Sequence, residues 1–121
     1  MPDSHDSRDT DGARLRNLFE DTARAPDERF LTLAAGGGAR VERIVSWGQA
    51  SPPGFWYDQA QAEWVAVLCG RARLSLRAPD EVREMEAGDT LLIAAGRPHR
   101  VDWTDPDQPT VWLAVFLDAP G

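Results

Sequence analysis

Short runs of residues, some continuously apolar and some alternating between apolar and polar, fill most of the chain beyond residue 30. The clearest run extends from Arg71 to Arg77, where Ala72, Leu74 and Leu76 fall on one face and polar side chains on the other. Turns rich in glycine, proline and aspartate separate the runs. Further strands are expected at 30–34, 41–47, 55–59, 64–69, 82–85, 90–94, 99–104 and 110–117. Such closely spaced strands, with no helices alternating between them, predict an all-β sandwich or barrel.

The first 29 residues follow a different pattern. Residues 1–11 are rich in Asp and Ser, which predicts a disordered acidic tail containing a solvated His5. Within 14–20, the apolar residues Leu15, Leu18 and Phe19 have helical spacing. We therefore expect a short helix or turn packed on the exterior of the barrel, and a division into 1–29 and a barrel domain at 30–121.

Composition narrows the possible partners. The chain has 121 residues, the size of one domain, with five Trp and four Phe to line a core and a pocket. Its formal net charge of −7 argues against nucleic acid or an anionic membrane as a partner. A single cysteine, Cys69, cannot form an internal disulfide, and no apolar run approaches membrane-spanning length. No secretory signal is recognisable, so a cytoplasmic location is expected.

Two segments place chemically capable residues at a characteristic spacing. Glycines at Gly88 and Gly96 lead to His99, and Glu63 precedes Gly70 by seven residues. This spacing resembles the two signature motifs of the cupin superfamily, over about residues 41–117. The resemblance implies a small double-stranded β-barrel of two antiparallel sheets, in which the glutamate and the histidine converge on a metal in a central pocket.

The chain departs from the family pattern at several positions. Ala94 replaces a proline, and Trp103 stands where the family often has asparagine. The two upstream histidines are missing, and their counterparts lie within residues 55–59. The family allows two gap lengths, which place either Tyr57 and Gln59 or Trp56 and Asp58 in the ligand positions. The sequence does not choose between these pairs, because strand alternation points one pair inward and the other outward.

Loss of two imidazoles shifts the potential ligand set toward oxygen donors. Glu63, His99 and Asp58 would make a site plausible for Mn, Fe or Zn. Tyr57 and Gln59 would instead complete a weaker mixed site, because an amide and an un-ionised phenol are poor ligands. A divalent metal, Fe, Mn, Ni or Zn, is therefore a possible cofactor.

Other residues are candidates for the wall of the pocket. By alternation, Val101 and Trp103 should share the face of His99. Trp103 or Trp56 is expected at the pocket mouth. Arg97 and Arg100 could bind a substrate carboxylate, although each taken singly is more typical of a solvated turn residue.

Three functions are compatible with these residues. The first is a metal-dependent small-molecule enzyme with Glu63 and His99 as ligands, of oxygenase, isomerase, cyclase or lyase type. The second is a metal-free cupin that binds a small ligand as a sensor or accessory protein. The third is metal-free acid–base catalysis by Glu63 and His99, as in an isomerase or lyase. The resemblance also implies a homodimer, for which Trp64, Ala66 and Leu68 offer an outward apolar surface.

Overall fold

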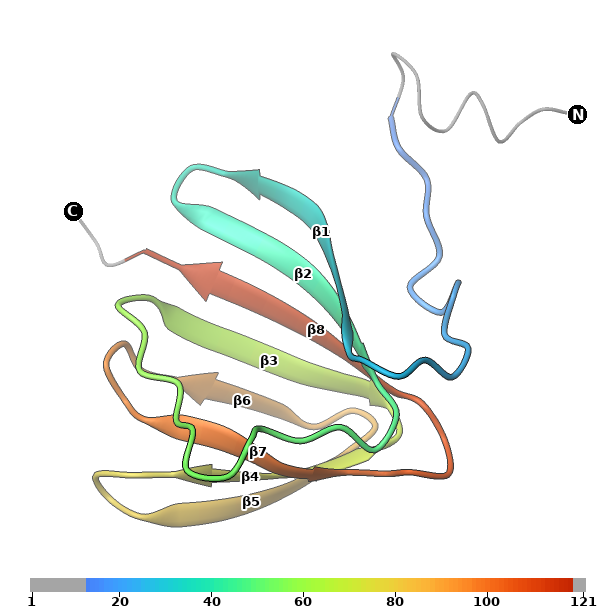
Figure 1. Cartoon of the computed structure of the whole chain (residues 1–121). Helices are drawn as coiled ribbons and strands as arrows, with labels where there is room; N and C mark the ends of the chain where they lie inside the picture. The colour runs from blue at the N-terminus through green and yellow to red at the C-terminus, as the bar shows by residue number, and fades with distance from the viewer. Residues whose placement is uncertain (1–12, 119–121) are drawn as a thin grey trace, which may run out of the picture.

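The computed structural model describes residues 13–118, which fold into eight strands (Figure 1). The strands are β1 (Arg29–Gly36), β2 (Ala39–Ser46), β3 (Ala62–Cys69), β4 (Arg71–Leu76), β5 (Glu81–Glu86), β6 (Thr90–Ile93), β7 (His99–Thr104) and β8 (Thr110–Leu117). No helix occurs in this part of the chain, and so none is long and apolar enough to cross a membrane. The expected tail at residues 1–11 lies outside the described residues.

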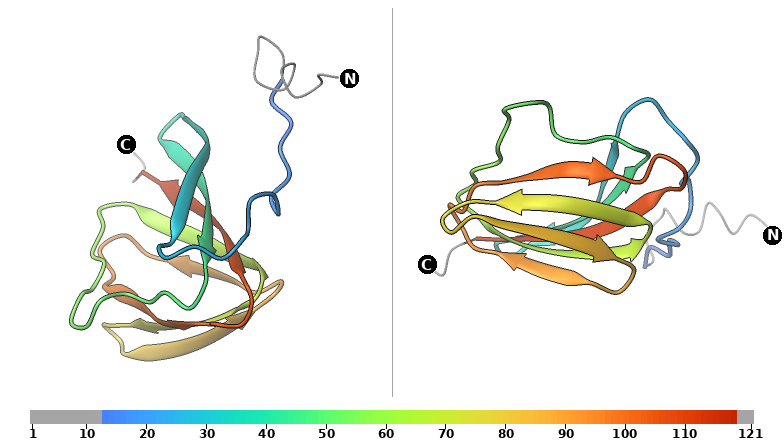
Figure 2. Two further views of the ribbon diagram at one scale, coloured as in Figure 1. Left: turned by 45° about the vertical axis from the view of Figure 1, so that its right-hand side comes forward. Right: turned by 90° about the horizontal axis from the view of Figure 1, so that it is seen from below.

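Two antiparallel sheets face each other. The larger sheet has the order β1-β2-β8-β3-β6, and the smaller has the order β5-β4-β7. Seen from below, the smaller sheet lies in front of the larger one (Figure 2). Chain neighbours β3 and β4 belong to different sheets, so the tight turn at Gly70 carries the chain from one layer to the other. This arrangement confirms the predicted all-β fold of two antiparallel sheets.

Gly70 is required by the close approach of another segment. Its φ is +85°, and a side-chain carbon at this position would lie 2.5 Å from the carbonyl oxygen of Pro109 and from Thr110. Only glycine combines this backbone conformation with the absence of a Cβ. The glycine that ends the Glu63 motif therefore allows the loop before β8 to pack against the β3–β4 turn.

The core lies between the two sheets. Val65, Val67 and Trp112 from the larger sheet meet Leu74 and Leu76 from the smaller one, and all five are nearly inaccessible to solvent. The alternation of apolar residues at 72, 74 and 76 is the pattern of β4 with one face on this core. Burying side chains of this size stabilises the fold by about 1.5–3 kcal/mol each.

One expected strand is instead a long connection. Residues 47–61 run from β2 to β3 beside β7, and their only bridge in the sheet pattern pairs Tyr57 with His99. This connection is coloured green in Figure 1. Two prolines, Pro52 and Pro53, limit the backbone donors that a regular ladder would need.

The segment before β1 forms a turn, not a helix, at 18–21, and it attaches to β2 through polar contacts. The Arg43 guanidinium donates hydrogen bonds to the carbonyls of Leu18 and Glu20. Leu15 and Phe19 remain 63% and 52% exposed, so the expectation that their apolar face packs on the barrel is wrong. Hydrogen bonds from Arg43 to backbone carbonyls, and not an apolar face, therefore attach this segment to β2.

The outer face of β3 differs in part from the expected apolar surface. Ala66 is buried at 6% exposure, while Trp64 and Leu68 are half-buried. Leu92 pairs with Trp64 across β3 and β6 and is 64% exposed. Homodimer formation through this face stays a prediction.

Candidate functional site

A cavity of about 90 Å³ opens between the two sheets. Its lining combines polar groups from several segments with an apolar wall. The polar members are Glu28, Glu42, Tyr57, Gln59, Glu63 and His99. The apolar members are Phe30, Ile44, Val65, Leu74, Ile93, Val101, Trp112 and Phe116. An apolar cavity with a few convergent polar groups is the usual form of a small-molecule site.

Glu63 and His99 meet in this cavity. Glu63 is near the start of β3 and His99 begins β7, so the pair joins the two sheets. His99 Nε2 lies 3.3 Å from Glu63 Oε1, and both side chains are largely buried. On the other side of the ring, His99 Nδ1 lies 3.0 Å from the carbonyl oxygen of Arg97. That carbonyl accepts a hydrogen bond from Nδ1–H and so directs Nε2 toward Glu63.

The pair holds a proton more tightly than an isolated imidazole would. Burial lowers the pKa of His99, but the hydrogen bonds to Glu63 and to the Arg97 carbonyl and the charges of Glu63 and Asp58 together raise that pKa above its usual value. With Nδ1–H donated to a carbonyl, a bare Nε2 would face a carboxylate oxygen. A proton between Nε2 and Oε1 removes this repulsion.

Tyr57 and Gln59 are the members of the 55–59 segment that line the cavity. Tyr57 exchanges both backbone hydrogen bonds with His99, at 2.7 and 3.0 Å, and its ring stacks on the imidazole at 5.5 Å between centroids. The carbonyl of Gln59 accepts a hydrogen bond from the Gly96 backbone N–H. The shorter of the two family gap lengths therefore describes the observed register.

The alternate pair points away from the cavity. Asp58 is exposed, and Trp56 lies under the Arg77 guanidinium, 3.8 Å from the ring centroid. Neither residue lines the cavity. Trp56 therefore does not lie at the mouth of the cavity as expected. Asp58 is likewise not placed as a third ligand beside Glu63 and His99.

Trp103 also lies outside the cavity, and a β-bulge is the reason. In the pairing of β4 with β7, Leu74 lies opposite Val101 but Arg73 lies opposite Trp103, so Asp102 is an extra residue. The bulge reverses the alternation, and Trp103 turns to the outer face beside Arg73, at 5.8 Å from the guanidinium. The expectation that Trp103 shares the face of His99 is therefore wrong.

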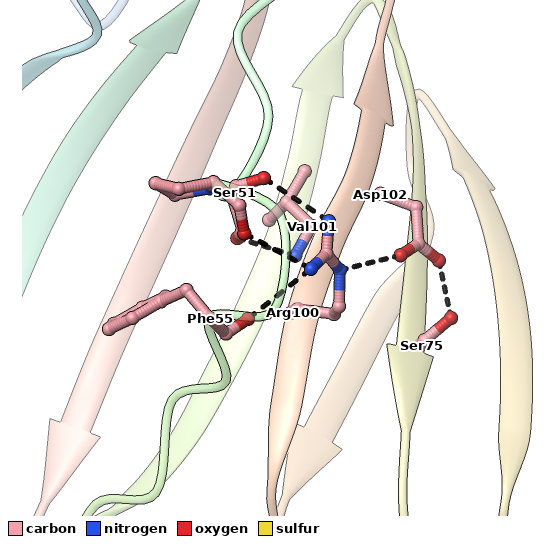
Figure 3. Close-up of polar contacts among 7 residues, drawn as sticks. Ser51, Phe55, Ser75, Arg100, Val101 and Asp102 are labelled. Carbon is pink, nitrogen blue, oxygen red and sulfur yellow. Dashed lines mark hydrogen bonds and ion pairs between the residues drawn. The ribbon is translucent and has the colours of Figure 1, made fainter.

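Arg97 and Arg100 use most of their guanidinium N–H donors in hydrogen bonds to other residues of the chain, so few donors remain for a ligand. Arg97 donates to the carbonyls of Arg77 and Pro79 and to the Glu81 carboxylate at 2.6 Å. Arg100 bonds the Asp102 carboxylate at 2.9 Å, and its other nitrogens bond the carbonyls of Ser51, Pro52 and Phe55 (Figure 3). Neither guanidinium lines the cavity. Both residues fasten loops, and a role in substrate binding has no support in this geometry.

The sequence analysis missed Glu28, which lies just before β1. Its carboxylate accepts a hydrogen bond from the Ser46 hydroxyl, which in turn accepts one from Trp112 Nε1 at 3.1 Å. Burial raises the pKa of Glu28, and the bond to Ser46 opposes that rise only in part. No motif includes this residue, so only the fold brings it to the cavity.

Trp112, Phe116 and Glu42 were missed as well. Trp112 and Phe116 lie on the same face of β8, and Phe116 pairs directly with Glu63. Their spacing of four residues in the strand expected at 110–117 is the signal that could have identified them as a pair. Glu42 on β2 bonds Arg40 Nε at 2.8 Å.

The polar groups of the cavity fall short of a typical metal site. Among residues 13–118, no group of three or more His, Cys, Asp or Glu side chains is placed to hold a metal ion. Glu63 and His99 are two strong donors, whereas catalytic zinc sites use three protein ligands. Burial and the charges of Glu28 and Glu63 raise the pKa of Tyr57, which keeps the phenol un-ionised and a weak donor. The donor set therefore does not fit a tightly held divalent ion.

Comparisons with other proteins place the chain in a family. Residues 44–116 match the cupin domain family. A crystal structure from Ralstonia eutropha JMP134, named "putative mannose-6-phosphate isomerase", is 50% identical, with a TM-score of 0.84 over 88% of this chain and 99% of that one. Among curated proteins, none matches the sequence.

Two more distant structures share the fold alone. A cupin superfamily protein from Desulfitobacterium hafniense DCB-2 is 14% identical, with a TM-score of 0.71 over 91% of this chain and 94% of that one. HppE, solved with Fe(II) and its substrate, is 13% identical, with a TM-score of 0.62 over 78% of this chain and 56% of that one. The family match spans more than half of the sequence, and the protein belongs to the cupin family.

Proposed function

We propose that this protein binds a small organic molecule in the barrel cavity and moves a proton on it with the Glu63–His99 pair. The observation that carries the proposal is the buried contact of 3.3 Å between Glu63 Oε1 and His99 Nε2 in the cavity wall. Paired groups that share one proton are suited to general acid–base catalysis, which contributes about 10²–10⁴-fold to rate.

The two residues would divide the task. The Glu63 carboxylate would accept a proton from the ligand, and the His99 imidazolium would donate its Nε2 proton to a ligand oxygen. The carbonyl of Arg97 would hold the imidazole in place by accepting from Nδ1. Passage of a proton from Glu63 to His99 would then restore the starting state. The name of the Ralstonia eutropha relative includes an isomerase, a type of enzyme that often works by such transfers.

A second candidate is a weakly held divalent metal ion at the same two residues. Its support is the Nδ1 contact with a backbone carbonyl, which metal-binding histidines commonly have. Glu63 and His99 would be the ligands, with Tyr57 and Gln59 as the nearest further oxygen donors, and the ion, Fe, Mn, Ni or Zn, would supply Lewis-acid chemistry. Because the same donors hold a proton, metal and proton would compete.

One experiment separates the two candidates. Metal content is measured by plasma mass spectrometry on untagged protein, and a fragment library is screened by thermal shift with wild type, Glu63→Gln and His99→Gln. We expect less than stoichiometric metal, and fragments whose binding weakens about tenfold in both variants, since each loses a charge-assisted hydrogen bond. The same measurement is repeated after incubation with added Fe, Mn, Ni or Zn, because a weakly held ion is recovered only when it is supplied in excess. Stoichiometric uptake by wild type that is lost in both variants would support the second candidate. If neither metal nor any fragment binds, both are overturned.

A further inference from the structure

The distribution of charge in the cavity bears on the class of ligand, and the inference rests on the proposed function. Three glutamates line the cavity, and no lysine or arginine lines it within the described residues. A phosphate or carboxylate ligand would need a cation or a cluster of N–H donors to replace its water. Among the described residues, His99 is the only basic side chain in the lining, and its Nε2 already faces Glu63.

Two of the three glutamates have a positive partner. Glu42 bonds Arg40 Nε at 2.8 Å, and Glu63 bonds His99 at 3.3 Å. Among the described residues, the carboxylate of Glu28 has only the hydroxyl of Ser46 as a partner. The guanidinium of Arg40 lies over the Phe116 ring, 4.3 Å from the centroid. Within residues 13–118, Glu28 is thus the one carboxyl group of the cavity that has no ion pair.

The rest of the lining suits the same kind of ligand. Aromatic rings of Phe30, Tyr57, Trp112 and Phe116 border the space that Glu28 faces. Aromatic faces attract cations, and a combination of aromatic rings and a carboxylate is typical of sites for organic ammonium groups. Trp112 is held by its hydrogen bond to Ser46, the same hydroxyl that binds Glu28. One network therefore fixes both the carboxylate and one of the rings.

We propose that the cavity takes a small organic cation, an ammonium or amidinium compound, and that Glu28 is the carboxylate that receives its positive group. Burial raises the pKa of Glu28, the hydrogen bond from Ser46 opposes that rise only in part, and a bound cation would favour the ionised form. The proposal assigns this chain a ligand opposite in charge to the sugar phosphate in the name of its 50% identical relative.

A matched set of probes tests the charge. Benzylamine, benzyl alcohol and benzoate have the same ring and differ in the charge of one group, and mannose 6-phosphate is the fourth probe. Their affinities for the full-length protein are measured by calorimetry at neutral pH. We expect benzylamine to bind about tenfold or more tightly than benzyl alcohol, in line with a charge-assisted hydrogen bond, and benzoate and mannose 6-phosphate to bind more weakly still.

A variant locates the effect at Glu28. In Glu28→Gln the amide keeps an acceptor for the Ser46 hydroxyl but loses the charge. Benzylamine should lose about tenfold in affinity, while benzyl alcohol should stay within about twofold. Glu84→Gln is the control, since it removes the same charge at an exposed residue paired with Arg73 on the outer face of the smaller sheet. It should leave all affinities unchanged.

Each other outcome overturns the inference in a recognisable way. If benzoate or mannose 6-phosphate binds at least as tightly as benzylamine, and Glu63→Gln weakens that binding, the ligand class is wrong and the proposed function stands. If benzylamine binds equally to wild type and Glu28→Gln, Glu28 is not its receptor. If benzylamine does not bind at all, the cation is excluded, and the fragment screen alone decides the proposed function.

Discussion

The two sides of β7 show how this barrel uses its polar groups. His99 points into the cavity, and Arg100, the next residue, points away from it. Arg100 has four hydrogen-bond acceptors, all supplied by its own chain (Figure 3). The ring of His99 has two partners, and the carboxylates of Glu63 and Glu28, which line the same cavity, can accept further hydrogen bonds.

The difference separates a structural network from a binding site. A polar group whose hydrogen bonds are all made to other protein groups contributes to stability. A ligand could bind to it only if some of those hydrogen bonds were broken. A group left partly satisfied beside an enclosed space is poised for a ligand. Outward residues of β7 should therefore matter for folding, and inward polar residues for binding.

Replacement of tryptophans tests the bulge that separates these two sides. Trp112→Ala removes a ring that is 3% exposed in the core, and we expect a loss of about 3–5 kcal/mol in the free energy of unfolding. Trp103→Ala removes a half-buried ring on the outer face, for which we expect a loss of about 1 kcal/mol. Both values come from urea denaturation at one pH.

The affinity for a cavity ligand tests the orientation of Trp103 more directly than the free energy of unfolding does. Trp103→Ala should leave that affinity unchanged, because the bulge at Asp102 turns the ring away from the cavity. A large loss of affinity in Trp103→Ala, with stability retained, would mean that the ring faces inward and that the comparison between the two sides fails.

Arg100→Ala removes the centre of the outward network. Its guanidinium holds the carbonyls of Ser51, Pro52 and Phe55, so the connection that carries Tyr57 into the cavity would be loosened. We expect a loss of about 2–3 kcal/mol in the free energy of unfolding, because a charged hydrogen-bond donor is removed from a mostly buried site. Arg100→Lys should recover only part of this loss, since an ammonium cannot reproduce the planar fork.

Arg77→Ala serves as the matched control for Arg100. Arg77 is exposed, and its guanidinium stacks on Trp56. An exposed contact of this kind contributes about 0.5–1 kcal/mol. Equal losses of stability in the two alanine variants, measured by urea denaturation, would contradict the structural role of the outward network.

The same comparison explains what the sequence could predict. Strand β4 follows from alternation and strand β8 from the loop residues before it, and the structure confirms the all-β architecture. Placement of Trp103 could not be predicted, because one inserted residue at Asp102 reverses the alternation and leaves no mark in the pattern. Alternation also did not show which residues of 55–59 face the cavity. In the folded protein, the backbone hydrogen bonds between Tyr57 and His99 fix that orientation.

The sequence also could not predict which residues distant in the chain come together in the fold. Glu63 and His99 were found because their spacing belongs to two local motifs. Glu28 reaches the cavity through a contact with Ser46, 18 residues away, and no periodicity links the two. The polar attachment of the 13–28 segment to Arg43 is likewise a tertiary effect, which the helical spacing of Leu15, Leu18 and Phe19 did not predict.

The smallest expected effect concerns the inward side and the pH dependence of stability. In the folded protein the pKa of His99 is raised above 6.5: burial lowers it, but the hydrogen bonds to Glu63 and the Arg97 carbonyl outweigh that effect. A group with a raised folded-state pKa contributes stability that is fully present below its unfolded pKa and is lost as the pH rises through the folded value. The free energy of unfolding of wild type, relative to His99→Gln, should therefore be largest near pH 6 and decline toward pH 9. His5→Gln, which replaces the only other histidine of the chain, should follow wild type throughout. A difference between wild type and His99→Gln that does not change with pH would show that Glu63 and His99 share no proton, and the distinction between the two sides of β7 would then rest on the hydrogen bonds of Arg100 alone.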